Sequence, residues 1–109
     1  FGVICHFFPM ANKKKISEMR NLGPMVEKDL NAAGIYYASE VKKLGAKKTF
    51  VKMLEGRQRT GRSASCCNAL YLYSIYGAIN NLDWREIPSA KKQEFKDYTQ
   101  ELRKSGLFS

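Results

Sequence analysis

The spacing of apolar residues predicts helices rather than strands along this chain. Ile16, Met19 and Leu22 recur every third residue, which fits one side of a short helix that ends at Gly23-Pro24. A second helix follows and should stop at Gly34, because glycine commonly ends helices. The apolar side of this second helix is expected to comprise Met25, Val26, Leu30 and Ala33. No segment alternates apolar and polar residues convincingly, so the pattern favours an all-α fold.

The middle of the chain predicts two more helices separated by Gly45. Ser39 is a plausible N-cap, with Glu40 in the first turn, for a short helix that runs through Lys43. A further apolar stripe extends up to Gly56 and comprises Phe50, Val51 and Leu54. Residues 57–63 contain no apolar side chain and are predicted to form a loop.

The C-terminal part predicts a buried helix, a turn and an amphipathic helix. Ser63 or Ser65 should cap a long helix that reaches about Asn80, and because its 66–79 stretch is apolar nearly all round we expect it to be central and buried. Trp84 with Ile87-Pro88 is interpreted as an apolar turn, in which Trp84 anchors either the core or the turn itself. Ser89 should cap the last helix, which Gly106 closes. The apolar face of that helix comprises Phe95, Tyr98 and Leu102.

These elements predict a compact bundle of five to six short helices around the central helix, with glycine hinges like those of helix-hairpin-helix modules. Residues 19–24 and 41–46 match in residue class at most positions, so we interpret them as one helix–Leu-Gly–helix device used twice. Residues 13–109 are expected to form a single domain, whereas residues 1–12 are expected to be an appendage or leader.

Length and composition narrow the class of protein. A chain of 109 residues suffices for one domain. No apolar run approaches the ~20 residues of a membrane-spanning helix, so no membrane partner is expected. Three cysteines, two of them adjacent, argue against a disulfide framework and favour a cytoplasmic location.

The positive charge of the chain is concentrated in one segment. Residues 42–62 hold eight basic residues and one acid, and so contribute seven of the nine net positive charges. Such clustering favours an anionic partner, and duplex DNA bound without sequence specificity is the partner we consider first. The candidate nucleic-acid-binding residues are Lys42, Lys43, Gly45, Lys47, Lys48, Lys52, Arg57, Arg59 and Arg62.

The predicted hinge at Gly45 indicates how this basic segment would bind an anion. Gly45-Ala46 opens a helix whose first N–H groups are free, and whose dipole favours an anion such as a DNA phosphate. With five or six phosphate contacts, binding would fall with salt at a log–log slope of roughly −4 to −5. The segment 57–62 either adds backbone contacts or is a solvated connector, and the sequence leaves both alternatives open.

The other predicted hairpin consists of Asn21, Leu22, Gly23 and Pro24. Asn21 stands where a second glycine is usual, and we expect it to adopt the left-handed conformation that asparagine tolerates. Pro24 removes one N–H donor, and acids at 27 and 29 in the next helix would repel phosphate. We therefore favour a structural role for this first hairpin.

The residue pattern does not favour catalysis, a metal or a cofactor. Cys66 and Cys67 are expected to pack within a helix, because the one histidine, His6, lies in the appendage and supplies no base to them. Cys5 and His6 lack partners at metal-ligand spacing. We expect no enzyme.

Several landmarks occur together in one order. They are Asn21-Leu-Gly-Pro24, Ala33-Gly-Ile35, Leu44-Gly-Ala46, Leu72-Tyr-Ser-Ile-Tyr-Gly-Ala-Ile79 and Trp84 with Ile87-Pro88. This set resembles the C-terminal domain of the TfoX/Sxy family, bacterial regulators of natural competence and DNA transformation, over about residues 16–102. The resemblance implies a compact helical domain without catalysis or cofactor that acts with a transcriptional activator, here in a stand-alone version.

Together these features predict a non-enzymatic regulatory binding domain. It would contact DNA backbone phosphates, a transcription protein, or both, through the basic 42–62 surface. The protein partner would be a transcription activator or an RNA polymerase subunit. The alternative is a protein–protein adaptor that does not contact nucleic acid.

Overall fold

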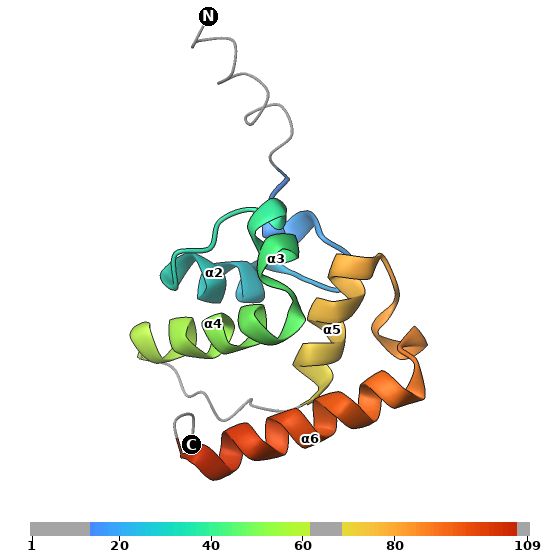
Figure 1. Ribbon diagram of the computed structural model, residues 1–109. Helices are drawn as coiled ribbons and strands as arrows, with labels where there is room; N and C mark the ends of the chain where they lie inside the picture. Colours follow the sequence, from blue (N-terminus) through green and yellow to red (C-terminus); the bar gives the residue numbers. More distant parts are fainter. Residues whose placement is uncertain (1–13, 62–68, 107–109) are drawn as a thin grey trace, which may run out of the picture.

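The computed structural model describes residues 14–61 and 69–106, which form five α-helices and two 3₁₀ turns. In chain order they are η1 (Ile16–Glu18), α2 (Pro24–Ala32), α3 (Ala38–Leu44), α4 (Ala46–Arg59), α5 (Ala69–Asn80), η2 (Trp84–Glu86) and α6 (Ser89–Ser105). The described residues form no β-strand, only an isolated bridge between Lys15 and Tyr37. The all-α prediction is confirmed. In Figure 1, α2, α3 and α4 form one group, α5 stands beside it, and α6 runs along the bottom of both.

The first predicted helix is wrong in length, because only η1 forms there. The chain leaves η1 in an extended conformation at Met19, and Asn21 then adopts a left-handed conformation with φ 70°. A 3₁₀ turn places every third side chain on one side, so Ile16 and Met19 both reach the core without a longer helix. The apolar spacing was therefore a sign of burial rather than of an α-helix.

Helices α2 and α4 cross in close contact at Gly56. A Cβ atom on Gly56 would lie 1.7 Å from the carbonyl oxygen of Asp29, so only glycine fits at this position. Asp29 is itself buried at the crossing, and Met25, which was predicted to face the core, is 58% exposed instead. The packing face of α2 thus consists of Val26, Asp29 and Leu30 rather than of its apolar residues alone.

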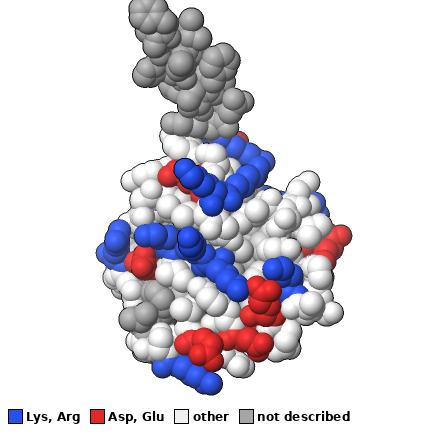
Figure 2. Space-filling view, viewed as in Figure 1, with Lys and Arg blue, Asp and Glu red and all other residues white. Residues whose placement is uncertain are grey.

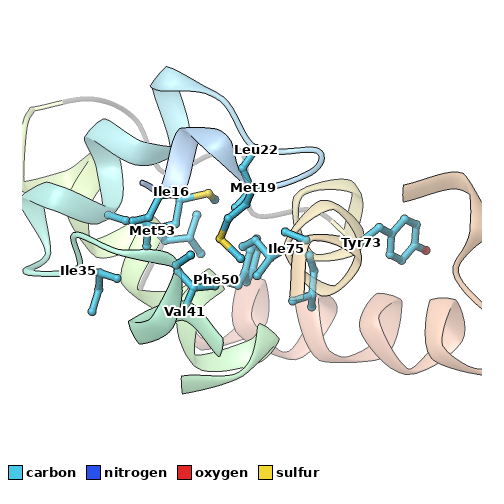
Figure 3. Packing of buried hydrophobic residues seen from close by; sticks show 14 of the residues in the cluster. Ile16, Met19, Leu22, Ile35, Val41, Phe50, Met53, Tyr73 and Ile75 are labelled. Atoms are coloured by element: carbon cyan, nitrogen blue, oxygen red, sulfur yellow. The ribbon is translucent and has the colours of Figure 1, made fainter. Parts of the chain in front are cut away.

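The core lies around α4 and α5 and continues on the α6 side of α5, where Tyr73 and Phe95 are also buried. Figure 3 shows Met19, Phe50 and Ile75 pointing toward one another, whereas Tyr73 points away from them on the other side of α5. There the Tyr73 ring lies 6.2 Å from that of Phe95, and its hydroxyl donates to the Lys92 carbonyl of α6 over 3.3 Å. Burial raises the pKa of Tyr73.

Two predictions about the C-terminal half need correction. Helix α5 is not buried on every side, because Leu70 is 55% exposed. Its predicted caps, Ser63 and Ser65, lie outside the described residues. Trp84 does not anchor the core either: it is 40% exposed, and the buried apolar residue of the turn is Ile87.

Several helix ends also differ from the predictions. Helix α3 begins at Ala38, before Ser39, because the Glu40 carboxylate accepts the N–H groups of Tyr36 and Tyr37. Ser89 is the first residue of α6 rather than its cap. The predicted loop at 57–63 is helical through Arg59. Gly106 closes α6 in the left-handed conformation, as predicted.

No helix within the described ranges is long and apolar enough to cross a membrane. The predicted appendage, residues 1–12, falls outside those ranges.

Candidate nucleic-acid interface

A single residue, Gly45, joins α3 to α4. Its φ of 85° is a conformation that L side chains rarely adopt, and it lets the chain turn sharply between the two helices. The Gly45 N–H closes α3 on the Val41 carbonyl, and the Gly45 carbonyl accepts the Thr49 N–H as the first bond of α4. The N–H groups of Ala46, Lys47 and Lys48 precede that bond and so have no carbonyl one turn earlier within the helix.

An open hollow of about 350 Å³ lies beside this turn. Its lining residues come from α3, the Gly45 turn, α4, α5 and α6: Leu44, Gly45, Ala46, Lys47, Lys48, Tyr76, Lys91, Glu94 and Phe95. Apolar atoms form most of the surface, and three lysines and one glutamate supply its charge. The hollow therefore combines an apolar floor, a helix N-terminus and a net positive rim.

One carboxylate, that of Glu94, connects the lysines of two helices at this hollow. Lys47 Nζ lies 2.9 Å from Glu94 Oε2, and Lys91 Nζ lies 3.2 Å from Oε1. The hydrogen bonds from Lys47 and then from Lys91 lower the pKa of Glu94. Lys47 also lies over the Tyr98 ring at 5.1 Å, and Lys91 over the Tyr76 ring at 5.7 Å. An external anion would therefore have to compete with Glu94 for Lys47 and Lys91.

The C-terminal half of α4 directs its basic side chains toward the protein itself. Arg57 forms an ion pair with Asp29 over 3.4 Å, and their side chains are only 19% and 2% exposed. Arg59 donates to the Ala32 carbonyl at the end of α2 over 3.3 Å. Arg62 lies outside the described residues. Arg57 and Arg59 therefore hold α2 against α4.

The N-terminal half of α4 and the adjoining α3 keep their cations at the surface. Figure 2 shows a row of basic side chains over α4 and another group over α3 on the same face, with acidic side chains along α6. Lys52 lies 3.5 Å from Glu55, an exposed pair on one helix that contributes little. Lys42, Lys43 and Lys48 are exposed, and none of them forms an ion pair with a described carboxylate. These three lysines are the cations most available to an external anion.

The first predicted hairpin is held by contacts within the protein. Asn21 is left-handed as predicted, and its Nδ2 donates to the Leu82 carbonyl over 2.7 Å. Leu22 is buried, Gly23 is the N-cap of α2, and Pro24 is its first residue. Nearby, Glu27 accepts the Ser17 N–H over 3.0 Å, and this backbone hydrogen bond lowers the pKa of Glu27.

The resemblance between residues 19–24 and 41–46 does not extend to their structure. Gly23 is extended, with φ −136° and a short turn before it, whereas Gly45 has φ 85° and joins two helices directly. The interpretation of one device used twice is therefore wrong. The two segments have similar residues but form different turns, because Asn21 rather than Gly23 adopts the left-handed conformation in the first segment.

Sequence reasoning missed the contribution of α6 to the hollow. Lys91 and Glu94 face it next to Phe95, and Tyr76 of α5 joins them. The spacing of Lys91 and Glu94 on one side of a helix was visible in the sequence, but no local pattern shows that this side meets the start of α4.

Cys5, His6, Cys66 and Cys67 lie outside the described residues. Within the part of the chain that is described, no group of three His, Cys, Asp or Glu residues is arranged to hold a metal ion.

Comparisons with solved structures support the fold. A crystal structure of an uncharacterized protein from Listeria monocytogenes, in a triclinic form, is 32% identical with a TM-score of 0.70 and covers 82% of this chain and 93% of its own. A tetragonal form of a protein of unknown function from the same organism is 33% identical with a TM-score of 0.64, and the match covers 80% of this chain and 98% of that one. No curated protein is similar to the chain.

A comparison with protein families assigns the chain to one of them. The TfoX C-terminal domain matches residues 12–99, which is most of the sequence. This span includes the Gly45 turn and all of the hollow beside it. The domain family is of a regulatory type and is not known for enzymatic activity. The chain therefore belongs to the TfoX C-terminal domain family.

Proposed function

We propose that this domain is a non-enzymatic regulatory module that contacts the DNA backbone through the surface around Gly45. The observation that carries the proposal is the placement of Lys42, Lys43 and Lys48 on both sides of the turn without carboxylate partners among the described residues. Family membership supports a competence-related role. A transcription activator or an RNA polymerase subunit is the expected protein partner in such a role.

The local chemistry suits a phosphate. The N-terminal end of α4 carries partial positive charge and free N–H groups, and Lys48 lies within its first turn. Phosphate contacts of this kind position a protein on DNA without reading its sequence. Binding should therefore be independent of base sequence and strongly dependent on salt.

Charge reversal at the turn tests this proposal. Lys43→Glu combined with Lys48→Glu should abolish binding of a fluorescent duplex at about 50 mM salt, where electrostatic binding is strong. The matched control is Lys28→Glu with Lys96→Glu, which changes the net charge equally at two exposed positions on α2 and α6. Fluorescence anisotropy measures binding, and thermal unfolding checks that both variants stay folded.

Two results would contradict the proposal. In the first, the control pair weakens binding as much as the pair at the turn, so that only total charge matters. In the second, neither duplex nor single-stranded DNA binds the unmodified chain at low salt.

A protein–protein adaptor is the second candidate, and the apolar floor of the hollow favours it. Leu44 lies at this floor, and exposed apolar surface beside cations suits a partner segment with apolar and acidic residues. An adaptor of this kind gives no anisotropy change with DNA, and Leu44→Asn should release a co-purifying activator or polymerase subunit. If the partner stays bound to the Leu44→Asn variant, the adaptor function fails.

A further inference from the structure

A second hollow, separate from the one beside Gly45, lies between η1, α3 and the end of α5. Its volume is about 300 Å³. The residues that line it are Lys14, Met19, Arg20, Ala38, Lys42, Ala78, Ile79 and Asn81. This size is at the lower end of the range of small-molecule pockets. The hollow therefore has room for a small ligand rather than for a macromolecular segment.

All the charged residues that line this second hollow are basic. Lys14 and Lys42 form no ion pair with a described carboxylate. Arg20 lies 3.9 Å from Glu86, and both side chains are about half exposed or more. The charge of Arg20 also helps to lower the pKa of the Asp83 carboxylate. Three cations gathered around one space repel one another, and a bound anion would relieve that repulsion.

The end of α5 does not balance this charge. The C-terminal end of a helix attracts cations, which explains why basic side chains are tolerated beside Ile79 and Asn81. A helix end, however, carries only about half of an elementary charge. The positive charge of Lys14 and Lys42 thus remains unbalanced, and that of Arg20 is balanced only in part, by Glu86 and Asp83.

Long-range hydrogen bonds fix the segments that supply these cations. The Lys14 carbonyl accepts the Ala38 N–H of α3 over 2.8 Å. Next to Arg20, the Asn21 side chain donates to the Leu82 carbonyl beyond the end of α5 over 2.7 Å. Lys42 is carried by α3 itself. The three cations therefore come from three segments whose backbones are already held in place, so binding an anion requires little backbone ordering.

We propose that this second hollow binds the dianion of a phosphate monoester. A guanidinium group matches two phosphate oxygens at once, and two ammonium groups add point charges around the remaining oxygen atoms. Most of the exposed lining of this hollow is polar, which suits the phosphate group itself, and Met19, Ala38 and Ala78 are almost wholly buried beneath it. This site shares Lys42 with the proposed DNA surface but goes beyond it, because Lys14 and Arg20 play no part in the surface around Gly45.

An NMR titration of the whole chain tests the site. Inorganic phosphate and adenosine 5′-monophosphate are added in turn, with sodium chloride at matched ionic strength as the control because salt alone screens surface charges. Phosphate should shift the backbone amide signals around Arg20, Lys42 and Asn81, and the chloride control should not. Arg20→Gln should weaken phosphate binding about tenfold, as expected for losing a hydrogen bond to a charged group, and Lys14→Gln should weaken it in the same direction. Lys48→Gln, in the other hollow, should leave the phosphate-induced shifts around Arg20, Lys42 and Asn81 unchanged.

The source of the phosphate is distinguished with short duplexes that carry either a 5′-phosphate or a 5′-hydroxyl. If the phosphorylated duplex binds more tightly than the hydroxyl duplex, and Arg20→Gln removes this difference, the site binds a DNA end. If the two duplexes bind equally and the free nucleotide gives the stronger shifts, the site binds a small phosphorylated molecule. The proposal is overturned if chloride reproduces the phosphate shifts, or if Lys48→Gln weakens phosphate binding as much as Arg20→Gln does. Because Lys43 and Lys48 do not line this hollow, loss of DNA binding in the Lys43→Glu and Lys48→Glu variant would leave phosphate binding intact.

Discussion

The two ends of α4 carry similar basic side chains and use them in different ways. At its C-terminal end, Arg57 pairs with the buried Asp29 and Arg59 caps a carbonyl of α2. At its N-terminal end, Lys48 extends into solvent beside an open hollow and beside helix N–H groups. What separates the ends is the neighbouring element: α2 packs closely along one end, while the Gly45 turn leaves the other accessible.

This difference shows that the basic residues of one segment have two roles: some stabilise the fold, and others remain available to bind an anion. In the sequence, residues 42–62 form one cationic cluster. In the structure, an arginine whose partner is buried stabilises the fold, and a lysine without a partner remains available for an anion.

The largest effect is expected where α2 and α4 touch. Gly56→Ala places a methyl group against the Asp29 carbonyl, and overpacking of this kind should lower the free energy of unfolding by about 3 kcal/mol. Chemical denaturation measures the loss. Gly23→Ala is the control, because nothing lies near its Cβ position and its φ is accessible to any residue, so roughly 0.5 kcal/mol is expected there. Equal effects would refute the close contact.

Removal of Arg57 should be the next most damaging change. Arg57→Ala takes an ion-pair partner from the buried Asp29 carboxylate, and we expect a loss of about 2 kcal/mol in denaturation experiments. Lys52→Ala removes an exposed pair with Glu55 and should cost less than about 0.5 kcal/mol. An Arg57→Ala variant as stable as Lys52→Ala would show that the C-terminal end of α4 is not structural.

The N-terminal end should show the reverse behaviour. Lys48→Ala is expected to change stability by less than about 0.5 kcal/mol, because the side chain is exposed and has no described carboxylate partner. Duplex affinity should nevertheless fall roughly tenfold at low salt with the loss of one phosphate contact. Anisotropy measured beside denaturation separates the two effects, and a stability loss without an affinity loss would reverse the assignment.

The smallest effect is expected from Glu94. Glu94→Gln releases Lys47 and Lys91 from their shared carboxylate and should raise duplex affinity a few-fold with little change in stability. The pKa of Glu94 is lowered in the folded state, so its stabilising contribution is complete at neutral pH and is lost as the pH falls through that lowered value. The difference in DNA affinity between the two proteins should shrink over the same acidic range. A constant difference there would mean that Glu94 does not compete with phosphate.

Much of the fold followed from local patterns in the sequence. The glycines at 34, 45 and 106 marked helix ends, and each has positive φ in the structure. The apolar stripes placed Phe50, Leu54 and Phe95 correctly in the core. These features are set by residues close together in the chain, so a sequence pattern is sufficient to show them.

The site was less predictable because it depends on contacts between distant segments. The pairing of Arg57 with Asp29 follows from the crossing of α2 and α4. The sequence predicted only a loop at 57–63 and gave no sign of this contact. Glu94 reaches Lys47 only because α6 returns to the start of α4. In both cases the packing of distant segments decides whether a cation has a carboxylate partner, and the local spacing of residues in the sequence does not show this.

The salt dependence of duplex binding tests the division of charge most directly. If Lys42, Lys43 and Lys48 alone meet phosphates, the logarithm of the affinity should fall against the logarithm of the salt concentration with a slope of about −3. That value is shallower than the sequence alone suggested, because Arg57 and Arg59 contact α2 instead. A slope of about −6, as all the basic residues from 42 to 59 together would give, or no measurable binding at low salt, would contradict this account.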